Sequence, residues 1–214
     1  ISDALLRHVH AAGVELRFGQ RVQHIELAGG AAAGVVLEHG ERIAAANIVA
    51  TVSGFEVAQR LLPARAVPRR LARTARRAPL SHRAVSIQLG CAAAIGDGAF
   101  IVNHVPALEH QGRMHQTPGA RPDWLSFTVP TRVQPGLAAN GGTIIECFAP
   151  ACDIATASEW TPQRTESVVA HYLAGLRRHW PGLSVETMRV IDPPAFRDQR
   201  HLHEGALYGV APGA

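Results

Sequence analysis

The chain has 214 residues, of which 47% are hydrophobic, so it can bury a sizeable core as one domain or two lobes. No apolar run approaches the roughly 20 residues that span a bilayer, and no signal peptide is recognised, which favours a cytoplasmic protein. The net charge is +4, but every basic residue is arginine, a usage that a GC-rich genome produces by itself. Because no helix-turn-helix, zinc or aromatic-interleaved pattern accompanies the charge, nucleic-acid binding is not predicted.

The first part of the chain predicts a helix followed by a small antiparallel sheet. Helical spacing of apolar residues extends over 2–12, and Gly13 is a typical helix end. Three short β-type runs follow, separated by Gly29-Gly30 and by His39-Gly40, which predicts a three-stranded meander over Arg21–Leu27, Ala33–Glu38 and Arg42–Ala45. The apolar run Ile48–Val52 is expected to form a buried strand.

Two helices are predicted next, over Gly54–Leu62 and Val67–Ala78. The second has Leu71, Ala75 and Ala78 on one side, and arginines occupy the rest of its surface: Arg69, Arg70, Arg73, Arg76 and Arg77. Such a basic face is usually just solvated. The alternative is a basic amphipathic helix in peripheral contact with an anionic membrane, which would then be the inner face of the cytoplasmic membrane.

The later part of the chain predicts a second sheet. Four strands are expected over Arg83–Leu89, Phe100–Val105, Trp124–Val129 and Gly142–Phe148, with a polar stretch over Glu109–Asp123 that is a loop or a frayed helix. Thr161 and Pro162 begin the strongest predicted helix, which Pro181-Gly182 ends. A strand over Val185–Ile191 is expected to stop at Pro193-Pro194, and Phe196–Gly209 is expected to be extended.

No metal site is predicted. The three cysteines, Cys91, Cys147 and Cys152, share no ligand spacing, so buried reduced thiols are expected. Six histidines match no zinc pattern either, and surface or hydrogen-bonded positions are the preferred interpretation: His82, His104, His110, His115, His201 and His203.

Several segments together resemble the phytoene-desaturase-like flavoproteins of the amine-oxidase class. They are Arg21-Val22-Gln23-His24-Ile25, Gly34-Val35-Val36-Leu37-Glu38-His39-Gly40, Trp160-Thr161-Pro162 and Gly205-Ala206-Leu207-Tyr208-Gly209. The resemblance implies an α/β (α+β) fold: a partial FAD-binding domain with a β-meander over 1–62, a substrate domain with a mixed or antiparallel sheet flanked by helices over 63–204, and a return segment over 205–214. We expect a middle fragment of a longer protein, since the chain opens on Ile1 and lacks the Gly-x-Gly-x-x-Gly turn that binds the FAD pyrophosphate.

The resemblance also implies where FAD would bind in the parent protein. Val22 would pair its backbone with the adenine edge, Arg21 would lie beside it, and small residues would line the adenine–pyrophosphate side: Ala50, Thr51, Val52 and Ser53. The alternative is that Val22 is simply a strand residue and Ser53 a helix cap. No catalytic residue is predicted, because in flavin chemistry the cofactor carries the reaction and the protein orients the substrate.

The implied activity is hydride transfer between flavin and a lipophilic polyene-type substrate. Two other hypotheses stay open: a non-catalytic substrate- or partner-binding module left by truncation of a flavoprotein, and a relative that acts on tetrapyrroles or amines. Six apolar strand residues could line a substrate tunnel or belong to an ordinary core, and the sequence does not separate the two: Ile87, Leu89, Ile101, Phe127, Ile145 and Phe148.

Overall fold

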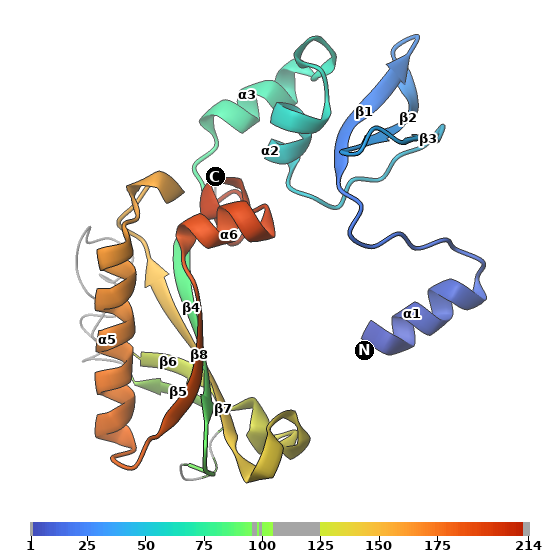
Figure 1. Cartoon of the computed structure of the whole chain (residues 1–214). Helices are drawn as coiled ribbons and strands as arrows, with labels where there is room; N and C mark the ends of the chain where they lie inside the picture. Colours follow the sequence, from blue (N-terminus) through green and yellow to red (C-terminus); the bar gives the residue numbers. More distant parts are fainter. Residues whose placement is uncertain (1, 96–97, 99, 105–124, 212–214) are drawn as a thin grey trace. The chain divides into compact units, whose positions relative to one another are not determined.

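The computed structural model describes residues 2–95, 98, 100–104 and 125–211. They form an α+β protein with two compact units, residues 1–77 and residues 78–214, and all strand pairs are antiparallel (Figure 1). The polar stretch Glu109–Asp123, predicted as a loop or a frayed helix, lies outside the described residues. The functional division at residues 62 and 204 stays a prediction.

The first unit opens with helix α1, Ser2–Ala11, which ends near Gly13 at a φ of +74°. The meander is confirmed as β1 (Val22–Ala28), β2 (Ala31–Leu37) and β3 (Arg42–Ala44), in that order in the sheet. Gly34 is required where β2 meets β3, because a Cβ there would lie only 2.5 Å from the carbonyl oxygen of Ile43. The small core of this unit consists of Ile25, Val36, Leu37, Phe55 and Leu61.

The helices of the first unit follow the prediction closely. The one expected over Gly54–Leu62 begins as α2, Gly54–Glu56, and continues as a wider π-helical turn, Val57–Leu61. After a 3-10 turn, Ala64–Ala66, helix α3 covers Arg69–Arg77.

The predicted strand over Ile48–Val52 is wrong. Residues 46–52 form no strand, and Val49 and Val52 are 89% and 46% exposed. A strand needs a neighbouring strand to satisfy its backbone, and the described residues supply none beyond the hydrogen bond from Ala45 to Ala33.

The second unit is built on five strands: β4 (Arg83–Cys91), β5 (Ile101–His104), β6 (Leu125–Thr128), β7 (Thr143–Ala151) and β8 (Val185–Ile191). Their order in the sheet is β5-β6-β7-β4-β8, so the long strands β4 and β7 lie at the centre. Helix α5, Pro162–His179, lies along one face of this sheet (Figure 1). Three 3-10 turns, Pro130–Arg132, Pro135–Leu137 and Ala139–Gly141, connect β6 to β7.

The core lies between α5 and the sheet. Tyr172 and Leu176 of α5 are buried against alternate residues of the central strands, among them Ile87 and Ile145. The Tyr172 hydroxyl donates a 2.7 Å hydrogen bond to the carbonyl oxygen of Phe148. Thr161 caps α5 as predicted, with its hydroxyl accepting from the amide of Arg164.

The end of the chain differs from the prediction. Pro193 does not merely stop β8; it begins a helix, α6 (Pro193–Arg200), whose N-cap Asp192 accepts from the amide of Ala195 at 3.0 Å. Proline is favoured in the first turn of a helix because its missing N–H would have no partner there. The extended segment expected over Phe196–Gly209 is therefore helical in its first part, and His201 is a left-handed C-cap with a φ of +56°.

The buried side chain of Arg83 forms hydrogen bonds to three separate segments of the second unit. Arg83, 3% exposed, donates to the carbonyl oxygens of Ser81, Ile154, Ala155 and Glu204, the bond to Glu204 measuring 3.0 Å. Burial lowers the pKa of its guanidinium, although nearby Glu204 and Glu159 act in the opposite direction. Arg83 thus connects the start of β4 to the segment just before the 3-10 turn Ala157–Glu159 and to the 3-10 turn His203–Gly205.

Candidate functional site

The predicted adenine contacts begin at the start of β1. Arg21 is a surface residue whose Nε lies 3.3 Å from Oε1 of Glu38, and both side chains are about half exposed, at 43% and 55%. Val22 is half-buried, and its carbonyl oxygen accepts a 2.8 Å hydrogen bond from Nη1 of Arg60. Arg60 is itself ion-paired with Glu56, four residues earlier on the same helical segment.

Arg60 was missed by the sequence reasoning. The only signal for it is the i,i+4 pair with Glu56, which by itself indicates a helix rather than a site. In the structure this arginine connects the start of β1 to the helical segment that begins after Ser53. The predicted positions Val22 and Ser53 are thus linked only through the helical residues 54–61, which Ser53 precedes and Arg60 joins to β1.

The other predicted positions lie on a strip of backbone, residues 46–52, of which all but the half-buried Ile48 are exposed. Ala50 and Thr51 are exposed, and Val52 is 46% exposed. Within the part of the chain that the structure describes, the backbone of this strip has no protein hydrogen-bond partner. At Ala50 and Thr51 this strip presents small, exposed side chains.

Ser53 has a structural role. Its hydroxyl accepts a 3.2 Å hydrogen bond from the amide of Phe55, which makes it the N-cap of α2. The interpretation of Ser53 as a helix cap is confirmed; its contact with a nucleotide stays a prediction.

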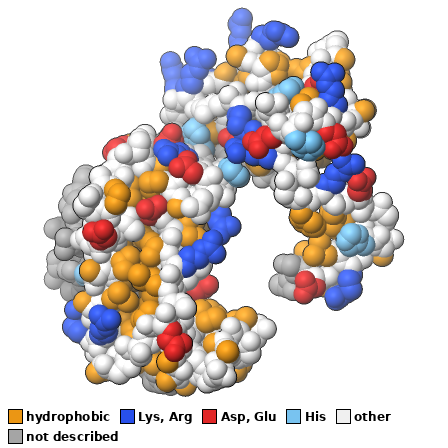
Figure 2. Space-filling model, viewed as in Figure 1, with side chains coloured by type: hydrophobic (Ala, Val, Ile, Leu, Met, Phe, Trp, Pro, Cys, Tyr) orange, Lys and Arg blue, Asp and Glu red, His pale blue; other side chains and the backbone are white. Residues whose placement is uncertain are grey.

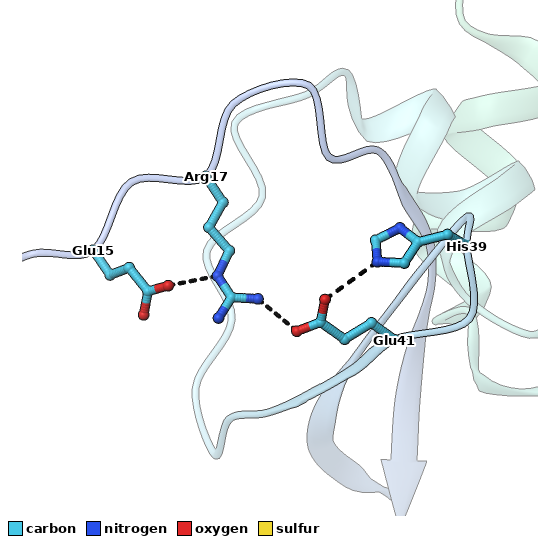
Figure 3. A network of polar contacts seen from close by, with 4 residues as sticks. All are labelled: Glu15, Arg17, His39 and Glu41. Carbon is cyan, nitrogen blue, oxygen red and sulfur yellow. Dashed lines mark hydrogen bonds and ion pairs between the residues drawn. The ribbon is translucent and has the colours of Figure 1, made fainter.

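A polar network joins the segment before β1 to the turn between β2 and β3 (Figure 3). Arg17 bonds Glu15 and Glu41 at 2.6 Å each, and Glu41 also bonds His39 at 3.2 Å. The hydrogen bonds that Arg17 donates to Glu15 and Glu41 raise the pKa of Arg17, and the bond that Glu41 accepts from Arg17 lowers the pKa of Glu41. Because these side chains are exposed, the network orients a loop at the surface and forms no enclosed site.

The second candidate region is the sheet face that α5 does not cover, here named the open face. Alternation along β4 turns Val85, Ile87 and Leu89 towards the core, and Ser86, Gln88 and Gly90 towards the open face. The strand register then aligns one open-face residue from each strand in a single row: Ile101, Thr128, Glu146, Gln88 and Arg189.

This row is mostly polar. Glu146 and Arg189 are exposed, Gln88 and Thr128 are half-buried, and Ile101 at the edge is 56% exposed. The row therefore presents a carboxylate, an amide and a guanidinium to whatever lies on the open face.

An aromatic cluster lies at one end of the open face. The ring of His82 contacts Phe148 and Tyr208 edge-on, at centroid distances of 6.4 Å and 5.6 Å. Tyr208 is brought there because its segment pairs with residues 79–82: its amide donates to the Ser81 hydroxyl at 2.9 Å, and the Ser81 amide donates to Gly209 at 2.8 Å. With Tyr208 69% exposed, the cluster, named the His82 cluster, offers flat apolar surface.

The structure also sorts the six tunnel candidates. Four are fully buried between the sheet and α5 and belong to the core: Ile87, Leu89, Phe127 and Ile145. Ile101 and Phe148 lie on the open face. Only these two can contact a ligand there.

The remaining expectations concern metals, thiols and membranes. Among the described residues, no group of three or more His, Cys, Asp or Glu could hold a metal ion. Cys91 and Cys147 are buried as expected, whereas Cys152 is half-buried. Within the described part of the chain, no helix combines the length and apolar character needed to cross a membrane.

The chain was compared with protein-family models, curated protein sequences and solved structures. No protein-family model and no curated protein sequence matches the chain. Solved structures do: an oxidoreductase from Methanosarcina mazei matches with a TM-score of 0.60 at 18% identity, over 89% of this chain and 41% of its own. A protein from Pyrococcus furiosus matches with a TM-score of 0.61 at 16% identity, over 88% and 41%.

A third similar structure is from Exiguobacterium and has the provisional name protoporphyrinogen oxidase, with a TM-score of 0.52 at 13% identity over 88% and 37%. At these identities the likeness establishes the fold alone. The chain has the α+β fold of part of these proteins and spans about two fifths of their length.

Proposed function

We propose that this chain is part of an FAD-dependent oxidoreductase whose lipophilic, unsaturated substrate lies on the open face. The observation that carries the proposal is the fold shared over 89% of the chain with an oxidoreductase, at a TM-score of 0.60. The resemblance of the meander and the Gly-Ala-Leu-Tyr-Gly segment to phytoene-desaturase-like flavoproteins supports the same class.

The first unit fits the adenine side of the cofactor. Ala50 and Thr51 of the strip 46–52 are small and exposed, and the strip's backbone amides have no partner among the described residues, which suits the close approach of a nucleotide. Ala50, Thr51 and Val52 would hold the adenine–pyrophosphate side, with Val22 and Arg21 at the adenine edge. The glycine turn that binds pyrophosphate is not part of this sequence, so we expect weak binding by this chain alone.

Bound FAD would supply the acceptor or donor of a hydride. The residues of the open face then have two tasks, which are to orient the substrate and to exclude water from it. Phe148, Tyr208 and Ile101 offer apolar contact, and the sheet behind them is rigid because its other face is packed against α5.

Two substrate classes compete. A polyene would use the apolar and aromatic contacts and leave the polar row in water. A tetrapyrrole would stack on the His82 cluster and direct its carboxylates to Arg189, and the exposed Arg189, beside the half-buried amide of Gln88, favours this second candidate. The provisional name of the Exiguobacterium structure is in line with it.

The first part of the proposal, that residues 21–22 and 50–53 bind the adenine side of FAD, is tested by NMR. Amide signals of the ¹⁵N-labelled chain are followed during titration with AMP, riboflavin and FAD at millimolar concentrations. AMP and FAD should shift Val22 and Thr51, riboflavin should not, and Ala50→Trp should weaken the effect. Ala28→Trp is the control, since Ala28 is exposed at the other end of β1. Absence of any AMP shift, or shifts only outside 21–22 and 50–53, would refute the adenine strip.

The second part of the proposal, that a lipophilic substrate lies on the open face, is tested by ligand binding in detergent. Protoporphyrin IX and lycopene are the probes. Tyr208→Ala should weaken both, whereas Arg189→Gln should weaken only the porphyrin; Arg177→Gln on α5 is the control. Equal loss of both ligands in Arg189→Gln would count against a tetrapyrrole. If neither cofactor nor probe binds, the chain is better described as the non-catalytic module.

A further inference from the structure

The positive charge of the chain is concentrated in one short segment. Residues 57–77 contain seven arginines and no acidic residue, whereas the whole chain has a net charge of only +4, so the remaining residues carry a net charge of −3. The basic character of the protein therefore belongs to this segment and not to its composition in general.

Helix α3 arranges five of these arginines in one stripe. At 100° per residue, all five fall within an arc of about 120°, along a helix about 13 Å long: Arg69, Arg70, Arg73, Arg76 and Arg77. All five are exposed. Figure 2 shows the blue side chains projecting from this part of the molecule. We name this surface the arginine stripe.

The apolar side of the same helix is already in use. Leu71, Ala72 and Ala75 are half-buried, and the side chain of Leu71 lies against α2, with its Cδ1 3.8 Å from a Cβ placed on Gly54. A helix that inserts into the interface between lipid headgroups and acyl chains must expose its apolar side. Helix α3 does not, so its outward contacts are electrostatic.

The electrostatic energy of the arginine stripe is unfavourable in the isolated chain. In the part of the chain that the structure describes, none of its five guanidinium groups forms an ion pair, in contrast to Arg60 with Glu56. Arg73 is three or four residues from four other arginines, spacings at which like charges repel. Arg69 and Arg70 also occupy the first helical turn, where the helix dipole disfavours cations.

We propose that the arginine stripe binds the surface of an anionic phospholipid membrane. Residues 64–77 contain no Asn, Gln or aromatic residue, the side chains that read or stack nucleic-acid bases. What they present is a dense field of guanidinium groups, which attracts the phosphates of lipid headgroups without a specific pocket. The proposal does not depend on the oxidoreductase activity, although a membrane would be the natural source of a lipophilic substrate.

The test is co-sedimentation of the full chain with vesicles of phosphatidylcholine, alone or mixed with phosphatidylglycerol, at low and high salt. Binding should require phosphatidylglycerol and disappear at high salt, because a surface potential is screened. Each arginine near the surface contributes about fivefold to the binding constant, so Arg73→Gln with Arg77→Gln should weaken binding by about 25-fold. Arg73→Lys with Arg77→Lys should retain it.

The matched control is Arg177→Gln with Arg178→Gln, two exposed arginines at the end of α5 that remove the same net charge. It should leave vesicle binding nearly unchanged, and circular dichroism checks that each variant is folded. The proposal is overturned if anionic vesicles are not bound, if both pairs weaken binding equally, or if duplex DNA at the same salt is bound more tightly than the vesicles.

Discussion

Gly175 is the position where a single added methyl group should disturb the packing of α5 on the sheet. It is buried, and a Cβ placed on it would lie 2.3 Å from Cδ1, 3.0 Å from Cδ2 and 3.1 Å from Cγ of Leu125. Leu125 belongs to β6 and is 6% exposed, so its side chain has little room to move away.

Two effects of opposite sign compete in Gly175→Ala. Alanine in place of glycine in a helix stabilises by about 1 kcal/mol. Overpacking a core costs about 1–3 kcal/mol, and because Cγ as well as both methyl groups of Leu125 is too close, rotation of the leucine end alone does not relieve the contact. We expect a net destabilisation of about 1 kcal/mol.

The assay is urea unfolding followed by tryptophan fluorescence. All three tryptophans, Trp124, Trp160 and Trp180, belong to the unit of residues 78–214, so the signal reports on that unit. Ala174→Gly, at an exposed position on the same helix, measures the helix-propensity effect separately. In the double variant with Leu125→Val, the added methyl gains space, and the coupling free energy should be favourable by about 1 kcal/mol.

The reasoning is refuted if Gly175→Ala is more stable than the natural chain by the amount that Ala174→Gly loses. That result would mean that Leu125 moves without cost and that helix propensity alone governs the position.

Three further predictions concern buried and capping groups. Arg83→Met should destabilise the second unit by about 3 kcal/mol in the same urea assay, because four carbonyl groups lose their donor, two of them, those of Ser81 and Ile154, in buried hydrogen bonds; a change below about 0.5 kcal/mol would contradict this role. Burial raises the pKa of the Cys147 thiol from 9.0 to about 12, so its contribution to stability is full below pH 9 and is lost as the pH rises towards 12, at up to about 1.4 kcal/mol per pH unit. Cys147→Ala should flatten this alkaline decline in unfolding curves, and an unchanged slope would show that the thiol does not cause it. Ser53→Ala should cost the first unit about 1 kcal/mol, measured by circular dichroism, whereas Ser53→Asp should keep the cap; if AMP binding is unchanged in both, Ser53 acts only as a cap.

Local signals were enough for most elements. Gly29-Gly30 lie between β1 and β2 with φ values of +59° and +84°, and Thr161-Pro162 begins α5, as their conformational preferences predict. One wrong prediction also comes from a local signal that has two interpretations. Pro193-Pro194 after a strand was interpreted as a stop, although Asp192 before it is a good N-cap and the pair begins α6.

The apolar run Ile48–Val52 shows why composition does not determine burial. Its residues are as apolar as those of β2, but β2 has β1 and β3 on either side, whereas the described residues provide no neighbour for 48–52. Similarly, Arg60 is unremarkable in sequence, and its bond to Val22 depends on a contact between residues 38 positions apart.

The sequence alone determined the order and type of most elements and the position of the arginines on one helix, because these depend on neighbours a few residues away. Only the tertiary structure decided which face of the second sheet is available. Ile87 and Phe148 are both apolar residues of central strands, yet the register of β4 with β7 and the position of α5 bury the first and leave the second beside His82 on the open face. Which face of a strand meets solvent depends on what is packed on the other, and that is a property of residues far apart in the chain.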